Sequence, residues 1–300
     1  MRRKVIKQGA ATLTISLPTK WARRFGLRSG DEVEISEGEK GLIISPTGTR
    51  LELKGELDIS NLSRSMIWRY LNAFYVNGFD EIIVTGCDRE KIALLKEANT
   101  TLVGFSLVEC EGNTCIIKAV SEAKLEEFDD MLRKIFSTLN TISMDTLEAI
   151  KRGDLEYLKK ARDRDKDLNN AVLFCLRILS KYGYKDQRKT TSMHAFIFFL
   201  ENIGDLYNDI SDICVSTGGK KRARDIKIIE KVNNIVSSLS SVFYEQDKDG
   251  LRDMYEANKV LKKEIDDILS RGPSDPLLYT IRRIPEVVGS VVESLMMIFL

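Results

Sequence analysis

The first fifty residues change their hydrophobic pattern three times. In "TLTISL" (12–17), Leu13, Ile15 and Leu17 alternate with polar side chains, which is typical of a half-buried strand. The next stretch, "PTKWARRF", sets Trp21 and Phe25 four residues apart, so both rings share one face of a short helix. A glycine and the turn "RSGD" follow, and "EVEI" and "GLIIS" then form a strand pair. Residues 1–48 are therefore predicted as a small β domain with one helix.

Residues 49–120 alternate between strand patterns and helix patterns. Strand patterns in "RLELKG" and "DEIIVTG" are each followed by a helical pattern, in "SRSMIWRYLNAFYVNG" and "DREKIALLKEAN". "TLVGFSLVEC" and "TCIIKAV" then form a closing hairpin. This order predicts a small α/β sandwich with helices on one face. It contains no glycine-rich phosphate loop and no catalytic cluster, which favours a connecting or dimerising domain.

From residue 121 to the end, the apolar positions follow a helical period almost throughout. Breaks rich in glycine and charge leave six long helices and fall at 151–154, 181–190, 216–221, 247–250 and 270–276. The "GGKK" in one break lacks the spacing of a phosphate-binding loop, so it is interpreted as a connection between helices. The chain as a whole is predicted to be multidomain, with an all-α C-terminal region.

The helical region contains a degenerate internal repeat. The segment "LENIGDLYNDISD" (200–212) aligns without gaps on "IRRIPEVVGSVVE" (281–293), at an offset of 81 residues. Upstream, "DKDLNN" aligns on "KKEIDD", so that Leu168 corresponds to Ile265. The two offsets differ because the first copy has the longer loop "KYGYKDQRKT". The region is predicted as two three-helix bundles, residues 121–217 and 220–300.

Acidic residues recur at helical spacing in the first copy. Four fall at i, i+4, i+8 and i+11 on one helix, and an i, i+4 polar pair lies on the preceding helix: Glu201, Asp205, Asp209 and Asp212, then Asp165 and Asn169. Neighbouring carboxylates repel, so such a stripe requires solvent, basic partners or a cation. Solvent exposure is the usual explanation of a charged stripe. If a cation binds, ligands that are all oxygen suit a hard or borderline metal ion.

The second copy has bases where the first copy has two of these acids. Arg282 occupies the position that corresponds to Glu201, and Lys262 the position that corresponds to Asp165. Internal ion pairs with Glu286 and Asp266 would then take the place of a bound ion, since opposite charges at this spacing neutralise each other. A metal ion is therefore predicted in the first bundle only.

The net charge is small but unevenly distributed. The chain carries a formal charge of +1, whereas residues 1–30 hold no acid and eight bases: Arg2, Arg3, Lys4, Lys7, Lys20, Arg23, Arg24 and Arg28. Helical spacing turns Arg23 and Arg24 away from the aromatic pair. The N-terminal end is therefore predicted to present a positive surface to an anionic partner. For any single cation, an ordinary solvated surface charge is the alternative.

Cysteine and histidine usage argues against most catalytic chemistry. The five cysteines form no CxxC pair and no zinc spacing, and Cys110 and Cys115 flank the hairpin tip "EGNT". We expect these two to be reduced, rather than joined in a disulfide or a metal clip. The single histidine, His194, excludes Ser-His-Asp and Cys-His triads and the paired Glu-x-x-His motifs of di-iron oxidases. The chain is predicted not to be an enzyme.

No segment predicts export or insertion into a membrane. The longest apolar runs, such as "AFIFFL" and "SLMMIFL", fall far short of the roughly 20 residues that span a bilayer. The basic N-terminus is not followed by an apolar run, so no signal peptide is expected. A cytoplasmic location is predicted.

The stretch "GAATLTISLPTKWARRFGLRSGDEVEI" resembles the AbrB/SpoVT-type DNA-binding domain. The shared pattern is a glycine, an alternating strand that ends in Leu-Pro, a short basic helix, Gly-Leu, and a Gly-Asp turn before the next strand. The resemblance implies a swapped-hairpin dimer whose two subunits present basic residues to DNA. Dimerisation also agrees with physical expectation, because so short a β domain has too little core to stand alone.

Residues 121–300 resemble PhoU, the phosphate-uptake regulator, which is a duplicated three-helix bundle. The segments "FLENIGDLYNDISD" and "RDKDLNN" carry this resemblance. In that family, E/DxxxD motifs of each repeat bind metal ions, which implies a divalent or ferric ion held by Asp165, Asn169, Glu201 and Asp205. The second repeat departs from the motif at Lys262 and Arg282.

Together the two resemblances imply an AbrB–PhoU fusion regulator of the kind common in archaea. The predicted function is a homodimeric, DNA-binding transcriptional regulator of phosphate uptake, with the eight N-terminal cations as candidate DNA contacts. The alternative is a PhoU-type signalling adaptor that acts on a phosphate transporter or a sensor kinase without regulating genes directly. Such an adaptor would keep its partner after loss of residues 1–48, whereas DNA binding would be lost.

Overall fold

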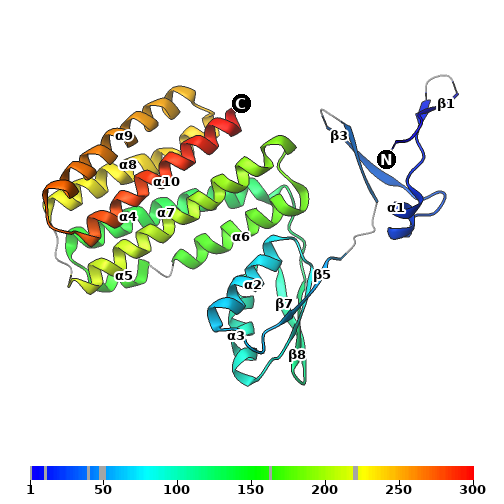
Figure 1. Ribbon diagram of the computed structural model, residues 1–300, viewed down its shortest axis with the longest axis horizontal. Helices are drawn as coiled ribbons and strands as arrows, with labels where there is room; N and C mark the ends of the chain where they lie inside the picture. The colour runs from blue at the N-terminus through cyan, green and yellow to red at the C-terminus, as the bar shows by residue number, and fades with distance from the viewer. Residues whose placement is uncertain (1, 10–11, 39–40, 47–51, 162–163, 219–221) are drawn as a thin grey trace. The chain divides into compact units, whose positions relative to one another are not determined.

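The computed structural model describes residues 2–9, 12–38, 41–46, 52–161, 164–218 and 222–300. Contacts divide the chain into two compact units, residues 1–53 and 54–300. The order of architecture confirms the predicted fold class: a small β region, then an α/β sheet, then a long helical region (Figure 1).

The first unit begins with two short strands and a helix. β1 (Ile6–Gln8) pairs antiparallel with β2 (Thr12–Thr14), and α1 (Thr19–Arg24) follows. The alternating pattern predicts a strand over residues 12–17, whereas only the first three pair, because β1 offers only three partners in register. Gly26 follows α1 with a φ of 66°, a left-handed conformation that favours glycine.

The first unit ends in a β-hairpin. β3 (Val33–Gly38) pairs antiparallel with β4 (Gly41–Pro46), which confirms the predicted strand pair. Among the side chains described between residues 2 and 53, none is buried. The described side chains of a single copy therefore form no hydrophobic core of their own.

The second unit opens with a four-stranded mixed sheet. Its strands, in order across the sheet, are β5 (Lys54–Asp58), β6 (Glu81–Thr85), β8 (Thr114–Ala119) and β7 (Phe105–Glu111). β5 and β6 are parallel, and the other pairs are antiparallel. Helices α2 (Arg64–Val76) and α3 (Arg89–Asn99) lie together on one face of the sheet (Figure 1). β5 begins later than the predicted "RLELKG" segment, since Lys54 is the first residue in register with β6.

The two faces of this sheet differ in polarity. A hydrophobic core fills the space toward the helices, and its fully buried members include Leu71, Ile82, Val84, Leu95 and Cys115. On the other face, Lys54, Glu81 and Lys118 lie opposite one another on three strands. The Glu81 carboxylate lies 2.9 Å from Lys54 Nζ and 3.4 Å from Lys118 Nζ. Its hydrogen bond from Lys54, aided by Lys118, holds the pKa of Glu81 below its usual range.

The rest of the second unit is helical. Its helices are α4 (Glu127–Arg152), α5 (Leu155–Ala161), α6 (Asp165–Tyr182), α7 (Thr190–Ser216), α8 (Ala223–Glu245), α9 (Lys248–Arg271) and α10 (Pro276–Phe299), with a 3-10 turn η2 (Gln187–Lys189) before α7. The breaks fall at or near the predicted positions, but α9 begins at Lys248, inside the break expected at 247–250, and the second expected helix is divided into α5 and α6. Over the described residues, no helix has the length and apolar character needed to cross a membrane.

The two aligned copies bury the same positions. Ile203 of α7 and Ile284 of α10 are both fully buried, as are Leu168 of α6 and Ile265 of α9. Gly204 lets α6 approach α7 closely, because a Cβ at that position would lie 2.3 Å from Leu168 Cδ2. The helical period of the sequence therefore identified the inward faces of the repeat.

One buried arginine joins the sheet region to the helical region. Arg177 of α6 donates to the backbone carbonyls of Tyr75 at 2.8 Å and Phe79 at 2.7 Å, and to Asp80 Oδ1 at 2.9 Å. Lys181, one turn further along α6, donates to the same carboxylate oxygen. Arg177 is only 3% exposed, so these contacts are shielded from water and fix the segment between α2 and β6 to α6.

The β7–β8 hairpin contains a disulfide bond, so the prediction of reduced thiols there is wrong. Cys110 and Cys115 face each other in the strand register, with Cα atoms 4.1 Å apart. Sequence spacing shows only that the two flank a turn, whereas the register decides that their side chains meet on one face of the sheet. Cys87, Cys175 and Cys214 are buried free thiols.

Candidate functional site

All eight predicted DNA-contact cations are exposed. They lie before β1, within β1, in α1 and in the turn after it: Arg2, Arg3, Lys4, Lys7, Lys20, Arg23, Arg24 and Arg28. Within the part of the chain that the structure describes, none of the eight forms an ion pair with a carboxylate. Their charge is therefore available to an anionic partner.

Helix α1 brings its two aromatic side chains together, but Arg24 is not turned fully away from them, because its guanidinium lies 6.0 Å from the centroid of the Phe25 ring. The Trp21 and Phe25 rings lie 5.0 Å apart at their centroids and are both partly covered. Arg23 and Arg24 lie in the last turn and are exposed. Basic residues at a helix C-terminus also favour the negative end of the helix dipole, so their placement suits the helix itself.

The same unit leaves large apolar side chains in water. These are Val5, Ile6, Leu13, Ile15, Ile35 and Leu42, each about half exposed or more. Leu13, which the strand pattern predicts as a core residue, is 69% exposed in a single chain. Large apolar side chains exposed in this number on so small a unit are typical of an interaction site. The basic surface and the uncovered apolar surface therefore belong to the same unit.

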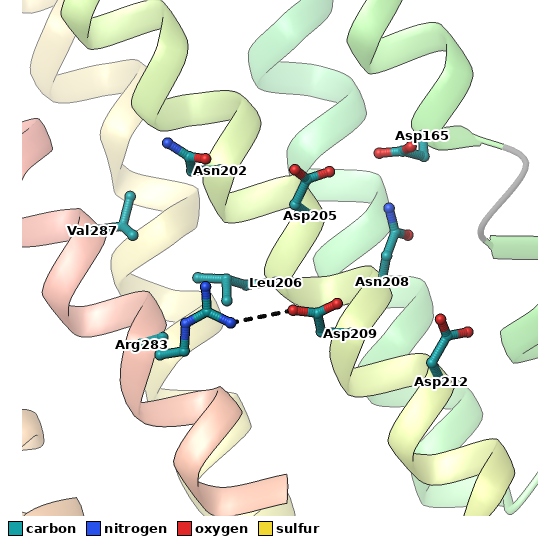
Figure 2. A pocket seen from close by; sticks show the side chains of 9 residues that line it. All are labelled: Asp165, Asn202, Asp205, Leu206, Asn208, Asp209, Asp212, Arg283 and Val287. Carbon is teal, nitrogen blue, oxygen red and sulfur yellow. Dashed lines mark hydrogen bonds and ion pairs between the residues drawn. The ribbon is translucent and has the colours of Figure 1, made fainter. Parts of the chain in front are cut away.

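A groove of about 600 Å³ runs along α7 in the second unit (Figure 2). Its walls come from α6, α7 and α10 and consist of Asp165, Asn202, Asp205, Leu206, Asn208, Asp209, Asp212, Arg283 and Val287. The acidic α7 members, Asp205, Asp209 and Asp212, recur at intervals of three or four residues, so they share one helix face. With four aspartates and one arginine, the groove is strongly acidic.

The residues of the predicted metal-ligand set lie at this groove or beside it. Asp165 and Asp205 line the groove, whereas Asn169 and Glu201 lie outside its wall. Asn169 Nδ2 donates to Asp165 Oδ2 at 2.9 Å, as the i, i+4 spacing allows. Asn169 Oδ1 is buried and has no hydrogen-bond partner among the described residues. An acceptor oxygen of this kind is free to meet a donor or a cation.

Burial and the repulsion among the carboxylates on this face of α7 raise the pKa values of two of them. Burial, followed by the charges of Asp205 and Asp165, raises the pKa of Glu201 to about 7. Desolvation of its carboxylate, followed by the charges of Asp165 and Asp209, raises the pKa of Asp205. These carboxylates are thus close enough to disfavour each other's ionisation. No three His, Cys, Asp or Glu side chains of the described ranges are arranged to hold a metal ion.

Sequence patterns missed Arg283, which reaches from α10 to the acidic face of α7. Its Nη1 donates to Asp209 Oδ2 at 3.3 Å (Figure 2). Arg283 aligns with Asn202 at the same offset of 81 residues, and both side chains line the groove. The repeat was therefore the signal that could have found it. Of the three explanations for the acidic stripe, a basic partner holds for Asp209, while Asp205 is exposed to solvent.

The ion pairs expected in the second copy are present. The Arg282 guanidinium pairs with the carboxylates of Asp266 and Glu286, which raise the pKa of Arg282 further. Lys262 Nζ lies 3.9 Å from Glu286 Oε1. The exchange of acids for bases has thus replaced mutual repulsion with charge pairing on this face of the second copy.

Comparison with protein families places a known domain in the first unit. Residues 6–52 match the family described as "Antidote-toxin recognition MazE, bacterial antitoxin", so they form a domain of the MazE/AbrB type. The matched range contains β1–β4 and α1 and includes the exposed Arg23 and Arg24. No curated protein matches the chain.

Proposed function

We propose that the protein is a DNA-binding transcriptional regulator that acts as a homodimer through its first unit. The observation that carries the proposal is the surface of that unit: eight exposed cations, with no carboxylate partner among the described residues, five of them within the MazE/AbrB-type domain of residues 6–52. Domains of this type commonly bind DNA and dimerise. DNA presents a dense array of phosphates that such a surface would neutralise.

A second copy supplies the core that one copy lacks. The uncovered Leu13 and Ile6 are 69% and 59% exposed, and no described side chain of the unit is buried. Covering one such side chain stabilises an assembly by roughly 1.5–3 kcal/mol. A two-fold dimer buries the same side chain once in each of its two subunits, and it carries twice as many cations as one chain. Dimerisation and DNA binding are therefore parts of one proposal.

The cations differ in the role proposed for them. Arg2, Arg3, Lys4, Lys7, Arg23 and Arg24 are the main DNA contacts, and Lys20 and Arg28 are secondary. Backbone contacts supply affinity but carry no sequence information. Sequence choice would come from a few arginines that reach base edges, or from the shape of the DNA.

The salt dependence of binding tests the basic surface. We expect the variant Arg23→Ala/Arg24→Ala to lower the slope of log K against log salt by about 0.9 for each lost phosphate contact. If both arginines of both subunits contact phosphate, the loss is about 3.6. A matched control is Lys248→Ala/Lys259→Ala, which removes the same charge from exposed positions on α9 and should leave the slope unchanged.

Two outcomes would count against this surface. An unchanged slope in the arginine variant would reject α1 as a DNA contact. A dimeric protein that binds no DNA even at low salt would instead favour the toxin-recognition role that the family description names.

The helical region is proposed to couple DNA binding to phosphate supply, as its likeness to PhoU implies. Its duplicated helices bury matching positions, which supports an ancient duplication of one bundle. Mapping of the protein on the genome in phosphate-rich and phosphate-poor cells tests this: occupancy near phosphate-uptake genes should change. If the occupancy of DNA by the protein does not change between the two conditions, the proposed response to phosphate is rejected, whereas the proposal of DNA binding is unaffected. If the arginine variant still gave the phosphate response, the adaptor alternative would be favoured.

The acidic face of the first copy is proposed to bind a hard divalent or ferric ion. Asn169 Oδ1, which is buried and has no hydrogen-bond partner among the described residues, and the raised pKa of Glu201 support a site for positive charge there. Metal analysis of protein purified without chelator should find an ion in the wild type and less in Glu201→Gln. The matched control in the second copy is Glu286→Gln. Absence of metal from the wild type, or equal metal in both variants, would reject the site.

A further inference from the structure

The tip of the β7–β8 hairpin holds a disulfide whose two sulfurs lie in different environments. Cys110 is exposed, whereas Cys115 is completely buried in the core beneath α2 and α3. The two residues form a directly opposed cross-strand pair next to the turn, and they close a loop with a sequence separation of 5. A reagent in solution can therefore reach this bond only from the Cys110 side.

A third cysteine, Cys87, contacts the backbone of Cys115. Cys87 is buried just after β6, and its Sγ donates to the Val84 carbonyl at 3.5 Å and accepts a hydrogen bond from the backbone of Cys115. Its backbone N–H donates to the Asn113 carbonyl in the hairpin tip at 2.9 Å. Burial raises the pKa of the Cys87 thiol, so it stays protonated and does not attack the neighbouring disulfide. The tip is thus held by one covalent bond and by the hydrogen bond from Cys87.

We propose that Cys110–Cys115 is a reversible thiol–disulfide site, with a small-molecule thiol as co-reactant that enters at Cys110. A thiolate of the co-reactant attacks Cys110 Sγ, the sulfur–sulfur bond breaks, and Cys115 Sγ leaves and takes up a proton. A second molecule of thiol then attacks the co-reactant's sulfur in this mixed disulfide and releases the Cys110 thiol. Two electrons pass from two thiols to the protein, which gives one disulfide of the co-reactant and two cysteine thiols.

Reduction loosens the hairpin tip without opening the core. Cys115 remains packed among core side chains, while the tip keeps its strand pairing and the hydrogen bond from the Cys87 N–H to the Asn113 carbonyl. The loop-closure entropy of a cross-link this short corresponds to about a 40-fold change in the equilibrium for opening. β7 is an edge strand, so its outer residues are the ones that this change releases.

Counting thiols in the full-length protein tests the bond and its reversibility. Protein that has not been exposed to a thiol is denatured in the presence of N-ethylmaleimide, which labels free thiols. It should carry three labels, on the free cysteines Cys87, Cys175 and Cys214. Protein first equilibrated in the folded state with excess reduced glutathione should carry all five, and oxidised glutathione should return it to three. Amides of residues 111–114 should exchange hydrogen up to about 40-fold faster in the reduced form.

Two matched variants test the direction of attack. Cys115→Ala leaves the exposed Cys110 thiol, which should form a stable mixed disulfide with oxidised glutathione in the folded state. Cys110→Ala leaves only the buried Cys115, which should not. Five labels on wild-type protein after oxidised glutathione would show that no bond forms. Three labels that persist under reduced glutathione until the protein is unfolded, or equal adducts on both variants, would overturn the proposed site.

Discussion

Replacing Arg177 should weaken the junction between the sheet region and the helical region more than any surface charge would. The substitution Arg177→Met keeps much of the side-chain length but removes every donor. Three acceptors then lose a partner: the carbonyls of Tyr75 and Phe79 and the Asp80 carboxylate. Lys181 still pairs with Asp80, so the Asp80 carboxylate retains one positively charged partner.

The size of the loss follows from burial. The side chains of Arg177 and Asp80 are 4% and 11% exposed, so breaking this pair leaves a shielded carboxylate incompletely matched. Removing one partner of a buried pair typically destabilises a protein by about 3–5 kcal/mol. The guanidinium also lies 5.0 Å from the Tyr75 ring and 4.8 Å from the Phe105 ring, which adds roughly 0.5–2 kcal/mol for each contact. Because Lys181 compensates in part, we expect about 3–5 kcal/mol in total.

Thermal unfolding of the full-length protein, followed by circular dichroism, measures this loss. For a unit of this size, 1 kcal/mol lowers the melting temperature by about 2–4 °C, so we expect a decrease of at least about 6 °C. The control Lys231→Met breaks the pair of Lys231 with Glu264, whose side chains are 52% and 39% exposed. An exposed pair contributes at most about 1 kcal/mol. If the two variants melt within a degree or two of each other, the argument from burial is refuted.

Two further predictions concern the first unit and the acidic face. Leu13→Asp places a charge at a position that is 69% exposed in one chain but covered in the proposed dimer, so sedimentation of this variant should show a monomer. The control variant Val108→Asp should stay dimeric. A Leu13→Asp variant that is still dimeric would contradict the proposed interface. Glu201 has a folded-state pKa of about 7 against 4.5 in a model compound, so the folded state holds its proton more tightly and stability falls as pH rises between these values. Urea titrations at about pH 5 and pH 8 should show this fall in the wild type and a smaller one in Glu201→Gln; equal falls would contradict it.

Local pattern was a good guide to the elements and to the inward faces of the repeat. Alternation and helical spacing correctly indicated β3, β4, α2 and α3, because those signals depend on neighbours within one element. The same reasoning led from two exchanged acids to the ion pairs of Arg282 and Lys262, since an aligned repeat supplies its own spatial map. It overestimated the strand at 12–17, where β1 ends the pairing after three residues.

The sequence by itself determined the order of architecture, the basic N-terminal surface and the acidic face of α7. Each of these follows from which residues recur along one element, and such periodicity is written in the chain. Only the tertiary structure decided which distant groups meet: Arg177 with Asp80, Arg283 with Asp209, and Cys110 with Cys115. Those partners depend on register and on the packing of separate elements, which a one-dimensional period does not specify.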